Sequence, residues 1–353
     1  MRTESMKFLT ALVDAPSPSG YEGPAREVFR DYVAPYADEV RTDVHGNVIA
    51  VRNPEGRPRV MLAGHVDEIG FLVKYVSDEG YLYFSMVGGV DTSLVAAQQV
   101  RVWTAKGPVP GVVGKTPIHL QDRDAKPKKV EMHKLWIDIG ARNRADALKR
   151  VRIGDPITFS QSLQPLTRGL AAGRGFDDKI GVFVVAETLR LLARRKLKAA
   201  VYVVATVQEE LGLRGARTSA YAIAPDAGIA VDVEHATDYP DVEKARVGEV
   251  SLGKGPVISR GANINPVLGE LIVKTAEAHA IPYQLNAEPR ATGTDANPIQ
   301  ITRAGTAAAL IGVPTRYMHT PVEVVNLKDA GLAARLLAAV ATELPADISF
   351  IPD

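Results

Sequence analysis

Cysteine is absent from all 353 residues of the chain. This absence excludes disulfide bonds, thiolate nucleophiles and cysteine-based zinc sites, so any bound metal must be held by histidine, aspartate or glutamate. A chain without cysteine also suits a reducing compartment, and we expect the protein to be cytoplasmic.

The chain also has almost no net charge. The 42 basic and 41 acidic residues leave a formal net charge of +1, which gives no electrostatic reason to expect nucleic acid or an anionic membrane as a partner. No apolar run reaches the roughly 20 residues that span a membrane, and the charged N-terminus does not resemble a secretory signal. Repeats and low-complexity tracts are also missing, so the composition predicts an ordinary globular protein.

Three regions with different patterns of apolar and polar residues follow one another along the chain. Residues 1–66 combine helical patterns with a continuously apolar stretch at 59–63, which is typical of a strand buried on both faces. Between residues 67 and 167, short strand patterns separated by turns rich in glycine and proline predict a small β-barrel or β-sandwich. Residues 168–353 return to alternating helices and buried strands. We therefore predict a doubly wound α/β domain of residues 1–66 and 168–353, with a β-rich domain of residues 67–167 inserted into it.

The predicted elements have definite ranges. In the α/β domain the helices are expected at 4–13, 22–33, 178–195, 214–222, 263–279, 294–302 and 326–344, and the strands at 40–44, 47–51, 59–63, 199–206, 227–232, 281–287 and 307–312. In the inserted domain the strands are expected at 71–76, 81–87, 99–103, 111–114, 134–139 and 156–160, with a helix at 144–151. Trp103 and Trp136 are expected in the core of the inserted domain.

Side chains that bind metals gather where the predicted strands end. In an open α/β sheet, ligands bind beyond the carboxyl ends of the strands. Five groups are expected at this edge, namely His65 with Asp67, Asp177 with Asp178, Glu209 with Glu210, Asp232, and His319. Each has an ordinary explanation when taken singly, since a lone histidine usually serves the core or the surface and an aspartate often caps a helix. Five such groups at one edge favour a metal site.

Two divalent ions would account for the adjacent carboxylates. Pairs such as Asp177-Asp178 and Glu209-Glu210 repel one another unless positive charge lies beside them. A hydrolytic two-ion site uses histidine nitrogen and carboxylate oxygen, with one carboxylate as a bridge. The glutamate pair also permits a division of labour, in which one member binds metal and the other accepts a proton from water.

The sequence resembles the M42 family of metallo-aminopeptidases, which includes the tetrahedral and deblocking aminopeptidases. The resemblance covers about residues 5 to 345, and the order, spacing and flanking residues of its motifs all agree. The main matching stretches are Gly64-His-Val-Asp-Glu-Ile-Gly-Phe71, Phe176-Asp-Asp-Lys-Ile-Gly181, Val207-Gln-Glu-Glu-Leu-Gly-Leu-Arg-Gly-Ala216, Val231-Asp232 and Pro314-Thr-Arg-Tyr-Met-His-Thr-Pro-Val-Glu323.

The resemblance implies a role for each candidate residue. One ion would be bound by His65, Asp177 and Asp232, and the other by Asp177, Glu210 and His319. Glu209 would be the general base, and Asp67 would hold the imidazole of His65 in the right tautomer. In related co-catalytic enzymes the first aspartate of such a pair is the bridge, often before a cis peptide, so Asp177 is chosen over Asp178. Asp295, in a further matching stretch, is expected to belong to the specificity pocket.

The resemblance also implies cofactors, substrates and partners. The catalytic domain would be zinc-peptidase-like, would hold two zinc or cobalt ions and would remove N-terminal residues from short peptides. The inserted domain would mediate dimers, and these dimers would assemble into a hollow tetrahedral dodecamer.

Two alternatives of different kinds stay open at this stage. The first is another hydrolase on the same scaffold, such as a deacylase of N-acyl amino acids or a glycosidase that uses paired carboxylates. A glycosidase would leave the two histidines at the strand ends without a role. The second alternative is a non-catalytic assembly protein, which a metal content near zero would favour.

Overall fold

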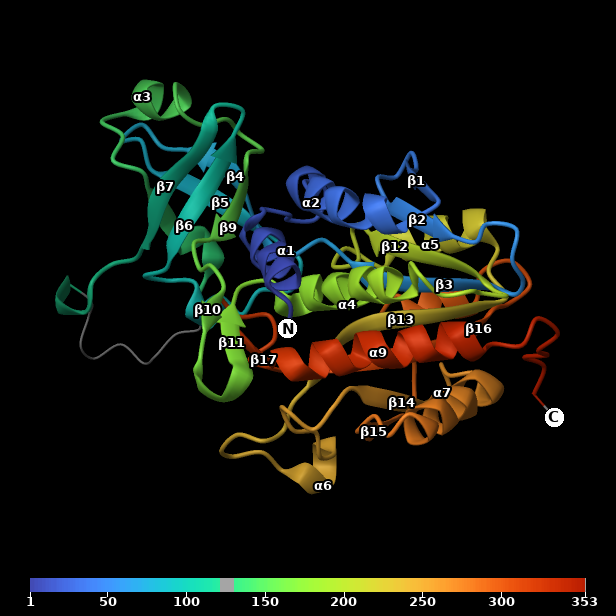
Figure 1. The fold of residues 1–353 in the computed structure, drawn as a ribbon. Helices are drawn as coiled ribbons and strands as arrows, with labels where there is room; N and C mark the ends of the chain where they lie inside the picture. Colours follow the sequence, from blue (N-terminus) through green and yellow to red (C-terminus); the bar gives the residue numbers. More distant parts are fainter. Residues whose placement is uncertain (121–129, 353) are drawn as a thin grey trace.

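The computed structural model describes residues 1–120 and 130–352. Its largest feature is an 11-stranded mixed sheet flanked by helices (Figure 1). The strand order is β1-β2-β12-β3-β13-β16-β17-β11-β10, and β14 pairs with both β16 and β15. These strands are β1 Glu39–Thr42, β2 Val48–Arg52, β3 Arg59–His65, β10 Gln164–Pro165, β11 Leu170–Gly173, β12 Ala200–Thr206, β13 Ala227–His235, β14 Val257–Gly261, β15 Gln284–Glu288, β16 Ala307–Arg316 and β17 Glu323–Asn326.

The centre of this sheet is parallel. Strands β12, β3, β13 and β16 lie side by side, and each adjacent pair among them is parallel. Their carboxyl ends therefore meet at one edge, which is the edge that the sequence predicts to carry the metal-binding side chains. The doubly wound α/β prediction is confirmed for this part of the chain.

Helices cover both faces of the sheet because its strands are apolar on both sides. In β12, Val201 and Val203 join one core cluster whereas Tyr202 and Val204 join another on the opposite face. The larger cluster packs beneath α1, α2, α4, α7 and α9, and the smaller one beneath α5 and α8. These helices are α1 Thr3–Asp14, α2 Gly23–Val33, α4 Phe176–Leu192, α5 Arg214–Ile223, α7 Pro266–Ala278, α8 Ala296–Gln300 and α9 Leu327–Glu343, with a short α6 at Lys244–Val247.

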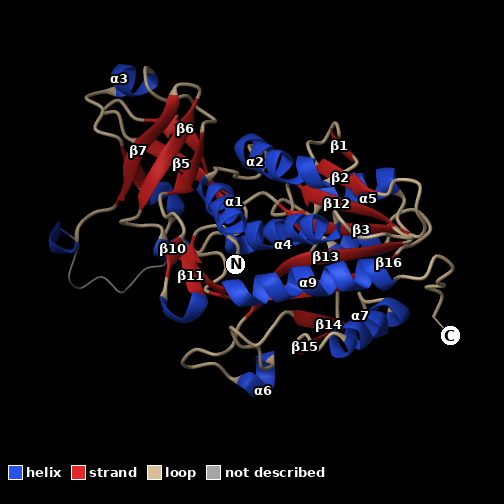
Figure 2. Ribbon diagram, viewed as in Figure 1, coloured by secondary structure: helices blue, strands red, loops and turns tan. Residues whose placement is uncertain are grey.

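A closed six-stranded barrel lies beside the sheet (Figure 2). Its strands follow the order β4-β5-β8-β7-β6-β9 and enclose a separate apolar core. They are β4 Gly70–Val76, β5 Leu82–Val87, β6 Gln99–Thr104, β7 Gly107–Gly114, β8 Trp136–Asp138 and β9 Pro156–Phe159, with α3 at Arg144–Leu148. The sequence predicted either a β-barrel or a β-sandwich for this region, and the structure shows the barrel.

The placement of the two tryptophans was wrong. Val100 and Val102 are buried in the barrel core, and Trp103 follows on the outward face of the same strand. Its Nε1 donates a hydrogen bond to Thr158 Oγ1 at 3.0 Å. Trp136 is also only partly buried. Each indole therefore lies outside the barrel core, because the alternation of a strand sends every second side chain outward.

Among the described residues, no helix is both long enough and apolar enough to cross a membrane.

Candidate metal centre

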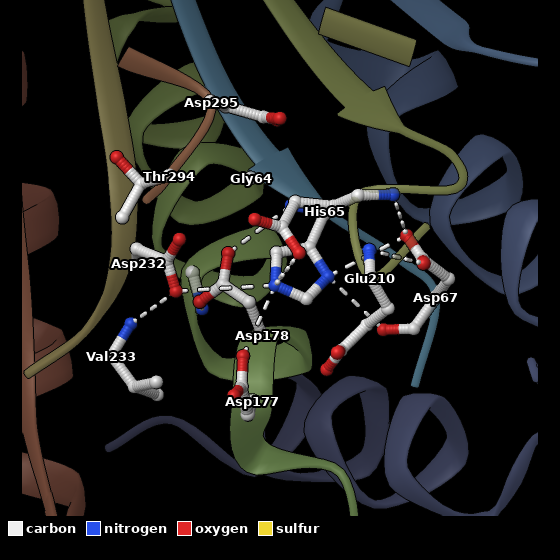
Figure 3. Close-up of polar contacts among 12 residues, drawn as sticks. Gly64, His65, Asp67, Asp177, Asp178, Glu210, Asp232, Val233, Thr294 and Asp295 are labelled. Carbon is white, nitrogen blue, oxygen red and sulfur yellow. Dashed lines mark hydrogen bonds and ion pairs between the residues drawn. The ribbon is translucent and has the colours of Figure 1, made fainter. Parts of the chain in front are cut away.

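The carboxyl edge of the sheet brings the predicted residues together. Figure 3 shows six of them, His65, Asp67, Asp177, Asp178, Glu210 and Asp232. His65 is the last residue of β3, and Asp232 lies near the end of β13. Glu209 and Glu210 follow β12, and His319 follows β16. Parallel pairing aligns these strand ends, and so residues up to 254 positions apart in sequence share one site.

Asp177 lies between the two imidazoles. Its Oδ1 is 3.1 Å from His65 Nε2, and its Oδ2 is 3.2 Å from His319 Nε2. Glu210 Oε1 is 3.3 Å from the same atom of His319. One carboxylate thus presents a different oxygen to each of two histidines, which is the arrangement that a bridging ligand requires.

Asp178 faces the backbone instead. Its Oδ2 accepts a hydrogen bond from the backbone N–H of His65 at 3.1 Å, and its Oδ1 accepts one from that of Gly181 at 3.0 Å. The Asp178 side chain is fully buried, and the peptide bond between Asp177 and Asp178 is cis. The two adjacent aspartates therefore have different surroundings, one facing the imidazoles and the other fastening the end of β3 to the start of α4.

Two groups of side chains have ligand atoms close enough to share an ion. In the first, ligand atoms of His65, Glu209 and Asp232 lie within 4.8 Å of one another, and in the second those of Asp177, Glu210 and His319 do. The second group equals the set that the family resemblance implies. The first differs from the implied set by one member, since Glu209 takes the place of Asp177, whose Oδ1 nevertheless contacts His65.

The protein groups alone leave this site strongly acidic. Burial raises the pKa of Asp232 well above its usual range, and the charge of Asp177 adds to this shift. Burial likewise raises the pKa of Glu209 to about 9, although His65 opposes it. Burial also disfavours ionised Asp177, but hydrogen bonds from His319 and His65 outweigh it and lower the pKa of that carboxyl. The site thus holds four carboxylates, Asp177, Glu209, Glu210 and Asp232, and only two imidazoles that could balance their negative charge.

Asp67 connects β3 to the loop that carries the two glutamates. His65 Nδ1 lies 3.1 Å from the backbone oxygen of Asp67 and 3.5 Å from its Oδ1. The carboxylate accepts hydrogen bonds from the backbone N–H groups of Glu209 and Glu210 at 3.0 and 3.2 Å, and from Ser19 Oγ at 2.7 Å. The backbone of Asp67 therefore orients the imidazole, while its side chain holds the glutamate loop.

Glu323 is a supporting residue that the sequence does not single out. It is buried at the start of β17, where Oε2 accepts a hydrogen bond from the Asp177 N–H at 2.9 Å. Its Oε1 accepts another from the His319 N–H at 3.1 Å. One carboxylate thus fastens two of the candidate ligands. The family-like stretch that ends at Glu323 was the only signal in the sequence.

A buried charge cluster lies behind the site. Glu68 is ion-paired with Arg174 and with Lys179, whose Nζ is 2.9 Å from Glu68 Oε1. Lys179 also donates to the backbone oxygen of Ala15 at 2.8 Å, and Arg174 donates to that of Asp14 at 3.0 Å. All three charged side chains are at least 95 % buried. This cluster ties α1 to the two segments that carry Asp67 and Asp177.

The barrel also reaches the site. The loop after β5 contains Gly88 and Gly89, and a Cβ on Gly89 would lie 3.2 Å from His319 Nδ1. A Cβ on Gly88 would lie 3.1 Å from Glu210 Oε2. Glycine at these positions therefore allows the barrel loop to pack directly against two candidate ligands.

A cavity of about 540 Å³ opens beside the candidate ligands. It extends along β13 to Glu234 and to Glu288 at the end of β15. Burial raises the pKa of Glu234 to about 7, and the charge of Glu288 adds to this shift against a hydrogen bond from Asn286. The cavity thus has one acidic end at the candidate ligands and another at this pair.

Asp295 does not line this cavity. Its side chain is buried and accepts a hydrogen bond from Thr206 Oγ1, whereas the preceding residues, Thr292 to Thr294, line the cavity wall. The expectation that Asp295 belongs to the pocket was therefore wrong, because the start of α8 turns its carboxylate toward the end of β12.

The donor set fits two divalent cations. It contains only imidazole nitrogen and carboxylate oxygen, which are the ligands that zinc-type sites accept when cysteine is missing. Buried carboxylates in contact with one another are costly unless a cation compensates them. The fold and this donor set together define an α/β protein with a candidate two-ion site, the kind of site found in aminopeptidases and phosphatases.

Comparison with known proteins identifies the family. The model of the M42 glutamyl aminopeptidase family matches residues 46–336. The lysyl aminopeptidase of Pyrococcus furiosus is 40% identical over 342 residues, which are 96% of this chain and 97% of that protein. The chain therefore belongs to the M42 family of peptidases, which are hydrolases acting on peptide bonds.

Solved structures agree with this assignment. The crystal structure of a TET aminopeptidase from the marine sediment archaeon Thaumarchaeota archaeon SCGC AB-539-E09 matches with a TM-score of 0.92 and 37% identity, over 97% of this chain and 96% of that one. The TET1 peptidase of Pyrococcus horikoshii, which can assemble into a tetrahedron or a large octahedral shell, matches with a TM-score of 0.86 and 32% identity, over 96% of this chain and 100% of that one. The resemblance that the sequence carries is confirmed.

Proposed function

We propose that the chain is a dinuclear-metal aminopeptidase that removes N-terminal residues from short peptides. The observation that carries this proposal is the position of Asp177, whose two oxygens lie 3.1 and 3.2 Å from the imidazoles of His65 and His319. His65 and Asp232 would hold one ion and Glu210 and His319 the other, with Asp177 as the shared ligand. When bound, zinc or cobalt would polarise the scissile carbonyl and lower the pKa of water.

Glu209 would move the proton in this reaction. Its side chain lines the cavity, and its Oε2 is 3.8 Å from His65 Nε2, beyond hydrogen-bonding distance. Burial raises its pKa to about 9 when no cation is present, and the positive charge of two bound ions would favour the ionised carboxylate, which can accept a proton. Glu209 would accept a proton from water as the carbonyl is attacked, and would return it to the departing amine.

We also propose that the division into residues 1–66 and 168–353 and residues 67–167 separates catalysis from assembly. The barrel presents large apolar side chains to solvent, among them Met86 at 44% and Val112 at 50% exposure. A relative with 32% identity assembles into a tetrahedron or an octahedral shell. The barrel would pair two copies, and dimers would form the dodecamer. Light scattering of the purified protein measures the mass that decides between a dimer and a dodecamer.

Hydrolysis of aminoacyl-anilides tests the activity. The protein should release aniline when zinc or cobalt is supplied, lose this activity in a chelator and regain it when the metal is returned. If the protein hydrolyses no anilide with zinc and none with cobalt, the proposal is refuted. Parallel assays with N-acyl amino acids and cellulose test the deacylase and glycosidase alternatives, and a metal content near zero would favour a non-catalytic assembly protein.

A further inference from the structure

The acidic end of the cavity begins with a residue two positions beyond a candidate ligand. Glu234 follows Asp232 on β13, and side chains two apart on a strand point to the same face. Both residues line the cavity. The strand rises about 3.3 Å per residue, so the two side chains leave the backbone about 6.6 Å apart. Glu234 is therefore about one side-chain length from the candidate ligands.

The adjacent strand β16 makes room for Glu234, and the more distant strand β15 gives it a partner. On β16, a Cβ at Gly312 would lie 2.6 Å from the Cβ of Glu234, so glycine is needed for this approach. Glu288 ends β15 and also lines the cavity. The Nδ2 of Asn286 donates to Glu288 Oε1 at 2.9 Å, and both Asn286 and Glu288 are close enough to Glu234 to shift its pKa. The two carboxylates, from different strands, therefore lie near each other.

Apolar residues share the cavity wall with the two acidic ends. Leu213, Leu310 and Met318 line the cavity, together with polar residues of 292–294. Among the described residues that line it, none is lysine or arginine. The glutamate pair therefore faces the cavity without a lysine or arginine from this wall.

We propose that Glu234 and Glu288 form a subsite for the side chain of the substrate's N-terminal residue and select lysine or arginine there. This inference rests on the proposed aminopeptidase function and names its substrate class. A basic side chain has an apolar stem and a charged tip, which match the apolar wall and the acidic end. Its cation would sit between two like charges that otherwise repel one another.

Other side chains would fit this subsite less well. A glutamate at the substrate's N-terminus would add a third carboxylate to the pair and would be repelled. A leucine or norleucine would fill the apolar part but would displace water from the carboxylates without giving them a donor. The chemistry of the wall therefore orders the preference as basic, then aliphatic, then acidic.

Paired anilides test this order. Lysyl- and norleucyl-anilides have side chains of similar length and differ in the terminal ammonium. In the wild type, kcat/KM for the lysyl substrate should exceed that for the norleucyl substrate by about 10-fold or more, the usual effect of a charge-assisted hydrogen bond. The ratio should fall about 10-fold in Glu234→Gln and in Glu288→Gln, and further in the double variant. The exposed Glu270→Gln on α7 is the matched control and should keep the wild-type ratio.

The possible outcomes separate this inference from the proposed function. If both anilides are hydrolysed at equal rates, or if the variants keep the wild-type ratio, the subsite is refuted while the aminopeptidase function stands. If neither anilide is hydrolysed with metal supplied, the proposed function fails.

Binding gives a readout that does not need turnover. In calorimetry, free L-lysine should bind the wild-type protein more tightly than L-norleucine by about 10-fold, and the difference should vanish in the double variant. Equal affinity for the two amino acids in the wild type would overturn the subsite even in an inactive protein.

Discussion

Asp67 holds the backbone of Glu209: its Oδ1 accepts a hydrogen bond from the Glu209 N–H at 3.0 Å. The same residue contacts the imidazole of His65 through its backbone oxygen at 3.1 Å. One residue two positions beyond the end of β3 therefore sets the positions of a candidate ligand and of the proposed base. The family resemblance implies only the contact with His65, and the contact with Glu209 comes from the structure.

Replacement of Asp67 by asparagine tests this link. Asparagine offers one acceptor oxygen where the carboxylate offers two, so at least one of the N–H groups of Glu209 and Glu210 loses its partner. We expect kcat to fall about 10- to 100-fold, the usual cost of losing a group that supports a metal ligand. Ser19→Ala removes one hydrogen bond to the same carboxylate and should have a smaller effect. A wild-type rate in Asp67→Asn would contradict this role.

The two adjacent glutamates should respond differently to the same change. Glu209→Gln should lower kcat by about 100-fold or more while the metal content stays near that of the wild type, because the proposed base is lost and the ligands remain. Glu210→Gln should lower the metal content as well. Elemental analysis of both variants, together with anilide hydrolysis, makes the comparison. Equal metal loss in both would show that Glu209 is a ligand.

The buried cluster of Glu68, Arg174 and Lys179 should be important for stability. Lys179→Met removes one of the two cations that pair with Glu68, and breaking a buried ion pair costs about 3 kcal/mol or more of unfolding free energy. Urea unfolding measures this change. The matched control is Arg150→Met, which breaks an exposed pair with Asp146 and should cost less than about 1 kcal/mol. Equal effects of the two substitutions would contradict the importance of burial.

Glu187 should make stability depend on pH in the acidic range. Burial opposes its ionisation, but hydrogen bonds from Arg190 and Tyr32 outweigh this and lower its pKa below the usual 4.5. A group with a lowered folded pKa binds fewer protons when folded, so its contribution is complete above pH 4.5 and is lost as the pH falls below that value.

The variant Glu187→Gln isolates this contribution. The wild type should be more stable than the variant at pH 7, by about 1 kcal/mol, and the difference should shrink as the pH falls below about 4.5. Because the other titrating groups are common to both proteins, their effects cancel in the difference. Thermal unfolding of both proteins across this range is the measurement, and a pH-independent difference would contradict the assignment.

The sequence predicts the central elements well and the peripheral ones poorly. The apolar runs at 199–206, 227–232 and 307–312 are strands, because buried parallel strands need apolar residues on both faces. Two of them extend further than predicted, to His235 and Arg316, since β13 and β16 stay paired through polar residues.

Other elements give no such signal. Strand β17, Glu323–Asn326, was missed because it is four residues long and begins and ends with a polar side chain. The strands β10, β11 and β14 were also not predicted.

The candidate site also has a part that the sequence predicts and a part that it does not. The rule that ligands lie at strand ends is enough to bring His65, Asp232 and Glu210 to one edge of the predicted sheet. It does not predict Glu323 or the cluster around Glu68, because their partners are backbone atoms and buried cations that no periodic pattern indicates. The cytoplasmic location, the identity of the ions and the roles of the site residues stay predictions.

Anomalous diffraction from crystals grown with zinc tests the central claim most directly. We predict two peaks in each subunit that share Asp177 as a ligand, one also contacting His65 and Asp232, and the other Glu210 and His319. A single peak, or two peaks that do not share Asp177, would contradict the two-ion account.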